Sequence, residues 1–142
     1  MKTKLQTISL LASILLGATA CSGGEETAKP NTPPAAKFSL EPQADDTAAM
    51  KEAKTRFTTV CASCHGTTGM GDGVAAAALN PKPRSYSDQA WQASVTDEHL
   101  AKVIVEGGAA VGKSPMMTAN GDLAGKKDVV DALVKIIRSY RK

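Results

Sequence analysis

The sequence predicts an all-α domain that wraps a bound group, preceded by a flexible segment and an export signal. Apolar residues recur at helical spacing in three segments, and no segment alternates polar and apolar residues for long. Aromatic residues make up only 4% of the chain, so a core built from side chains alone would be thin. We therefore expect long loops around a cofactor that brings apolar surface of its own.

Residues 1–20 are expected to be a signal peptide. The short basic start MKTK is followed by an apolar stretch that ends in small residues, LQTISLLASILLGATA. This stretch is short for a membrane-spanning helix, so export followed by cleavage is favoured over a retained anchor helix.

Cys21 follows directly, and LLGATAC resembles the bacterial lipobox, in which cleavage leaves a lipid-modified cysteine at the new N-terminus. Ala18 stands where that box usually carries leucine, and ATA also fits cleavage that leaves the cysteine unmodified. We favour the lipid because the other two cysteines share one motif, so lipidation leaves no odd thiol in an exported protein. This predicts a protein anchored on the periplasmic side of a bacterial membrane, with a soluble periplasmic protein as the alternative.

Residues 21–48 are expected to form a flexible linker between the lipid and a folded domain at residues 49–142. The linker contains four prolines among glycine, threonine and acidic residues, and it has too few apolar residues to fold alone. Phe38 and Leu40 are its only sizeable apolar residues, and they are the ones able to touch the domain.

Three segments of the domain carry the helical pattern. The first, AAMKEAKTRFTTVCASCH, places one apolar stripe on Met50, Ala53, Phe57, Val60 and Cys64. The second, TDEHLAKVIVEGG, begins with a threonine suited to capping and acidic residues suited to the first turn, and it ends at two glycines. The last, KKDVVDALVKIIRSYRK, repeats apolar residues at the same period, and the runs NPKPRSYSDQ and GAAVGKSPMMTANGD are expected to be loops.

The run Cys61-Ala-Ser-Cys64-His65 carries the chemistry. A redox dithiol would need a βαβ setting, which the pattern lacks, and a structural zinc ion would need further ligands where only His99 and loop carboxylates remain. The spacing fits covalent attachment of a c-type haem. One helical turn separates the two thiols that add to the haem vinyl groups, and the adjacent imidazole then reaches the iron.

On these residues the chain resembles the class I c-type cytochromes, which are small single-haem electron carriers, over about residues 49–141. The resemblance implies one covalent haem c, bound through Cys61 and Cys64, in a domain whose first and last helices cross. It places Phe57, four residues before the first cysteine, against the last helix, where Tyr140 is the aromatic partner.

The resemblance also implies an iron held by His65 and by a methionine from the loop ahead of the last helix. The family often carries Ser-Pro-x-Met-Pro there, and SPMMT puts Met117 on the ligand position and Met116 on the preceding one. The other candidates are not expected to bind the iron. Met70 lies too close to His65 in sequence, Met50 is assigned to helix packing, and His99 is assigned to a solvated helix face.

Two further features follow from the resemblance. A loop proline should offer its carbonyl to the ring N–H of His65, and LNPKPR provides Pro81 and Pro83 without a choice between them. Arg84, Tyr86 and Trp91 are placed to reach the haem propionates. The clusters Lys51/Lys54/Arg56, Lys82/Arg84 and Lys126/Lys127 are either an ordinary solvated surface or a basic ring that steers acidic partners to the haem edge.

The function implied is electron transfer and not enzymatic catalysis, by a monomer that shuttles one electron at a time between redox proteins and binds no nucleic acid. The alternatives are a haem enzyme or a peroxide or gas sensor with a labile sixth ligand, and a fixed cytochrome subunit of a larger oxidase or reductase. Donor, acceptor and reduction potential are not encoded in any motif of the chain.

Overall fold

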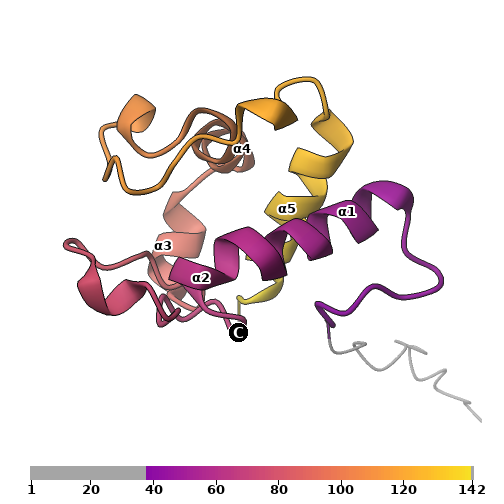
Figure 1. Cartoon of the computed structure of the whole chain (residues 1–142), viewed down its shortest axis with the longest axis horizontal. Helices are drawn as coiled ribbons and strands as arrows, with labels where there is room; N and C mark the ends of the chain where they lie inside the picture. Colours follow the sequence, from indigo (N-terminus) through magenta and orange to yellow (C-terminus); the bar gives the residue numbers. More distant parts are fainter. Residues whose placement is uncertain (1–37, 142) are drawn as a thin grey trace, which may run out of the picture. The chain divides into compact units, whose positions relative to one another are not determined.

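The computed structural model describes residues 38–141, which contain helices and no strands (Figure 1), and this confirms the all-α fold class. The predicted signal peptide, the lipidation of Cys21 and the linker up to residue 37 lie outside the described residues. The main helices are α1 (Ala48–Arg56), α2 (Ala62–His65), α3 (Gln89–Ser94), α4 (Asp97–Glu106) and α5 (Lys127–Ser139). Short 3-10 helices lie at η2 (Ala76–Ala78), η3 (Ala109–Val111) and η4 (Gly121–Leu123).

The first predicted helix is continuous but contains an irregular turn. Thr47 caps α1 by accepting a hydrogen bond from the Met50 N–H, and a π-helical turn, η1 (Phe57–Cys61), joins α1 to α2. A π turn holds more residues than an α turn, so it rotates the side chains that follow it. Phe57 is buried as predicted, whereas Val60, predicted on the same buried stripe, is 47% exposed.

The core lies where α1 and α5 pack together (Figure 1). Ala53 and Ile136 are fully buried there, and seven of the thirteen residues of α5 are buried. The Phe57 and Tyr140 rings lie 5.8 Å apart between centroids, which confirms the predicted contact of the first helix with the chain end.

The second predicted helix is α4, and its ends are those expected. The Thr96 hydroxyl accepts a hydrogen bond from the His99 N–H, and the helix ends at Gly107, whose φ is +81°. The sequence did not predict α3, a helix of six residues that Asp88 caps through the Trp91 N–H. Its length is below two full turns, so an apolar period had little chance to show.

Residues 38–47, here called the strap, lie against α1, and one lysine holds them. Lys54 is 3% exposed, and its ammonium group lies 2.7 Å from an Asp46 carboxylate oxygen and 3.2 Å from the Glu41 carbonyl. The same group lies 5.4 Å from the centre of the Phe38 ring, and Leu40 packs against the core. The interpretation of Lys54 as part of a solvated basic cluster is therefore wrong, because the strap covers it.

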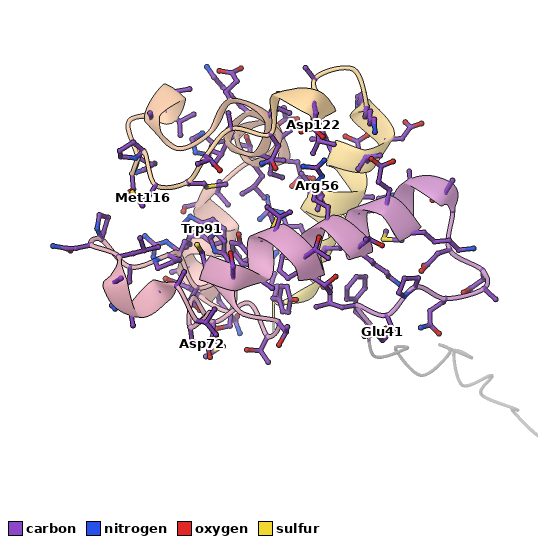
Figure 2. The ribbon with its side chains drawn as sticks, viewed as in Figure 1. Glu41, Arg56, Asp72, Trp91, Met116 and Asp122 are labelled. Atoms are coloured by element: carbon purple, nitrogen blue, oxygen red, sulfur yellow. The ribbon has the colours of Figure 1, made fainter. Side chains whose placement is uncertain are left out.

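Other members of the predicted basic clusters are also paired. Arg56 donates to Asn120 at 3.1 Å and forms an ion pair with Asp122, toward which it points in Figure 2. Further pairs join Lys126 to Glu52 and Lys127 to Asp131. No helix of residues 38–141 has both the length and the apolar character needed to cross a membrane.

Asp46→Asn should weaken the strap in a way that depends on pH. The Gln43 backbone N–H and the Lys54 ammonium lower the pKa of Asp46 from its usual 3.8. A lowered folded-state pKa contributes stability that is present above about pH 4 and is lost as the pH falls through the folded-state value. We expect the variant to be less stable than wild type at pH 7 and to lose less stability between pH 4 and pH 2.

Urea unfolding followed by circular dichroism across this pH range measures the effect. The neighbouring Asp45→Asn, at an exposed carboxylate, is the matched control and should follow wild type. Parallel stability curves for Asp46→Asn and wild type would contradict the role given to this ion pair.

Candidate functional site

A cavity of about 720 Å³ opens beside α2, and all four predicted ligand residues line it. Cys61, Cys64 and His65 come from the end of the first helical segment, and Met117 comes from the loop between α4 and α5, which passes above α2 in Figure 1. The remaining lining is largely apolar and includes Leu100, Val103, Ile104, Leu133 and Ile137. The volume lies within the roughly 300–1,000 Å³ typical of cofactor sites.

The donors suit the haem that the resemblance implies. Two thiols, one imidazole and one thioether are the groups required for covalent attachment and for two axial ligands. Cys61 and Cys64 are half-buried and form no disulfide. Burial raises the pKa of the Cys61 thiol to about 11, so it is protonated near neutral pH. Within residues 38–141, no three His, Cys, Asp or Glu side chains lie where they would jointly hold a metal ion.

His65 donates its ring N–H to a backbone carbonyl, but the carbonyl belongs to neither predicted proline. Its Nδ1 lies 3.2 Å from the carbonyl oxygen of Arg84, the residue after Pro83. The Pro83 carbonyl is directed at Gly71 instead, where a Cβ would lie 2.5 Å from its oxygen. The expectation for Pro81 or Pro83 is therefore corrected to Arg84, because the loop turns its carbonyl toward the ring one residue later.

This hydrogen bond determines which nitrogen of His65 is available. A carbonyl only accepts, so Nδ1 carries the proton and Nε2 keeps its lone pair. Burial lowers the pKa of His65, although the bond to Arg84 acts in the opposite direction. The imidazole is therefore neutral at pH 7, which is the form that binds a metal.

Tyr86 covers one face of the His65 ring. The two rings are stacked, with centroids 4.6 Å apart and planes at 15°, and Tyr86 is buried. Burial raises the pKa of Tyr86 well above its usual value, which keeps the phenol neutral. Trp91 stacks on Tyr86 at 5.8 Å, and the Arg84 guanidinium lies 5.8 Å from the centre of the Trp91 ring. We expected these three residues near the propionates, and no motif indicated that Tyr86 would stack on His65 with Trp91 and Arg84 behind it.

Met117 is held at the cavity by close backbone packing. The Gly108 N–H donates to the Met117 carbonyl at 2.8 Å, and the Gly108 carbonyl accepts from the Lys113 N–H at the same distance. A Cβ on Gly108 would lie 2.2 Å from the Ser114 carbonyl oxygen, so only glycine allows this approach.

The neighbouring and competing residues differ in exposure. Met116 also lines the cavity but is 61% exposed, whereas Met117 is half-buried (Figure 2 labels Met116 on its loop). Met70 is exposed and accepts a hydrogen bond from Ser87, and Met50 packs against the core. His99 lines the cavity although it is exposed. The assignment of the iron to His65 and Met117 stays a prediction.

Among known protein families, a model described as cytochrome c matches residues 50–140, which include most of α1, all of α2 to α5 and every residue that lines the cavity. No curated protein matches the chain.

Gly108→Ala should loosen the loop that carries Met117. The added methyl group has no room against the Ser114 carbonyl, so the loop must move and the Gly108–Met117 hydrogen bond weakens. A hydrogen bond contributes about 0.5–1.5 kcal/mol net, so we expect amide exchange at Gly108 to rise by up to about tenfold.

Amide hydrogen exchange over residues 108–118 checks this expectation. Gly121→Ala is the matched control, because nothing lies within 4 Å of a Cβ at Gly121. Unchanged protection of the loop in Gly108→Ala would show that its packing is looser than described.

Proposed function

Since the chain belongs to the cytochrome c family and so carries covalently bound haem c for electron transfer, we propose that it is a single-haem carrier that shuttles one electron at a time between redox proteins. Cys61 and Cys64 form the two thioether bonds. His65 and Met117 would hold the iron.

One observation carries the proposal: a single cavity is lined by both cysteines, the neutral imidazole of His65 and the half-buried Met117. An iron held by both the imidazole and the thioether would leave no position open for a substrate. Haem bound in this way supplies a reversible one-electron couple, with little change of structure between oxidation states.

The other contributions come from the chain's own side chains. The Arg84 carbonyl orients His65 and makes its Nε2 a better donor. The apolar wall of Leu100, Ile104 and Leu133 keeps water from the site, which favours a comparatively high potential. Gly108 fixes the backbone of the loop that carries Met117.

We further propose that the protein is a carrier and not an enzyme in its own right, with an electron donor and an acceptor as its partners. Export and a lipid on Cys21 would hold it at the periplasmic side of a bacterial membrane. The motif logic of residues 1–21 supports this placement.

Met117→Ala and Met116→Ala test the ligation. Both side chains line the cavity, but Met116 is 61% exposed and Met117 is half-buried, so we assign the iron to Met117. Met117→Ala should turn the ferric haem high-spin or water-ligated, lower its potential and let exogenous ligands bind. Met116→Ala should keep the low-spin spectrum.

The readout is the methionine–iron charge-transfer band of the ferric protein. Loss of the band in Met116→Ala alone would show that Met116, and not Met117, is the ligand. Survival of the band in both variants would show that neither Met116 nor Met117 is the ligand, and the carrier proposal would lose its best support. Rapid carbon monoxide binding by reduced wild type would favour the rival function of a haem enzyme or a sensor with a labile sixth ligand.

Cys21→Ser tests the anchor. Each buried CH₂ of an acyl chain contributes about 0.8 kcal/mol, so two or more chains anchor a protein stably. The variant should release haem-loaded protein into the soluble periplasmic fraction, whereas wild type stays with membranes. Mass spectrometry of a soluble wild type with unmodified Cys21 would refute the lipid and support simple cleavage.

A further inference from the structure

The His65 imidazole is held by a short segment, residues 84–86, that has no regular secondary structure. Its ring N–H donates to the Arg84 carbonyl at 3.2 Å, and its face stacks on Tyr86. The position of these residues therefore decides both the plane of the imidazole and the strength of its hydrogen bond. The contacts that hold residues 84–86 therefore affect the geometry of the site.

Two backbone contacts hold Tyr86. Its N–H donates to the Gly69 carbonyl at 2.7 Å, and its carbonyl accepts from the Gln92 side-chain amide at 2.8 Å. Trp91, the neighbour of Gln92 on α3, stacks on the Tyr86 ring. The helix α3 thus contacts Tyr86 at its carbonyl and at its ring.

Gln92 is itself held in one orientation. It is 2% exposed, and its amide nitrogen also donates to the Ile137 carbonyl at 2.9 Å, so both amide hydrogens are used. Its amide oxygen accepts from the Arg138 guanidinium at 2.8 Å. A flipped amide would place an oxygen against two carbonyls and an NH₂ group against a cation, so only the observed orientation satisfies all partners.

Arg138 joins this network to three elements. Its guanidinium also donates to the carbonyls of Gln92 and Val95, both at 2.7 Å, and to the Asp97 carboxylate at 2.8 Å. These bonds connect α5 with the end of α3 and the start of α4. A lysine has no planar fork of donors and would keep only part of this set.

We propose that Gln92 and Arg138 are positioning residues that fix the plane of the His65 imidazole through residues 84–86. They act without touching the cavity, since neither lines it. The inference rests on the proposed function, in which His65 holds the haem iron. Partners outside the ligand shell that orient a ligating histidine tune the metal through the basicity and angle of the ring.

Gln92→Leu removes both donors and leaves the Tyr86 carbonyl free to move. The Arg84–His65 hydrogen bond should then lengthen and the imidazole become a poorer donor to ferric iron. We expect the midpoint potential to rise and the g values of the low-spin ferric spectrum to shift, because they report the orientation of the axial imidazole. Gln92→Glu keeps the shape of the side chain and its contact with Arg138 but also removes the two amide donors. It should show the same shifts of the potential and the g values, and it replaces the leucine variant if that variant does not fold.

Val130→Ala is the matched control. Val130 is 3% exposed on α5 and does not line the cavity, so the variant loses core packing without touching the network. It should unfold at lower denaturant concentration with unchanged potential and g values. Arg138→Lys should shift both signatures in the direction of the Gln92 variants, by a smaller amount.

The proposal would be overturned if the Gln92 variants were destabilised like Val130→Ala but kept the wild-type potential and g values. Gln92 would then have a structural role only. Failure of the proposed function would look different. Wild type would then lack covalent haem, or His65→Ala would keep the wild-type potential and g values. The positioning proposal would fail in either case.

Discussion

The packing of Phe57 joins the parts of the molecule on which the site depends. Its ring is 1% exposed and lies 6.4 Å from that of Tyr86 and 5.8 Å from that of Tyr140. One side chain thus connects the first helical segment, the last helix and the residues that hold His65. Because Cys61 follows four residues later on the same helical segment, the place where Phe57 packs also decides where the thiols and the imidazole meet the cavity.

The ends of α4 could be predicted from the sequence because they depend on a few neighbouring residues. Thr96 and Gly107 mark the ends of α4 because capping and left-handed backbone are properties of single residues. The contact between Phe57 and Tyr140 was predictable through the family resemblance. The exposure of Val60 was not, because a π turn leaves no mark in an apolar period.

The surroundings of the site were harder to predict for a physical reason. The direction of the Arg84 carbonyl depends on how the whole loop packs, and no side chain encodes it. Lys54 reads as a surface residue, since only the folded strap brings Asp46 and Phe38 to it. Gln92 bonds partners six and 45 residues away, and such pairings are not visible in a single sequence. By contrast, the two thiols and the imidazole lie within five residues, so one motif could predict them together.

The strap has a mechanical consequence. A force on the chain ahead of residue 38 is resisted by the buried Lys54, which donates to the Glu41 carbonyl and forms an ion pair with the Asp46 carboxylate. The load then enters α1 through Lys54, in the last turn of this helix, so the first turn of α1 does not have to fray. A force on the linker is thus carried by an ion pair and a hydrogen bond before it reaches the backbone of α1.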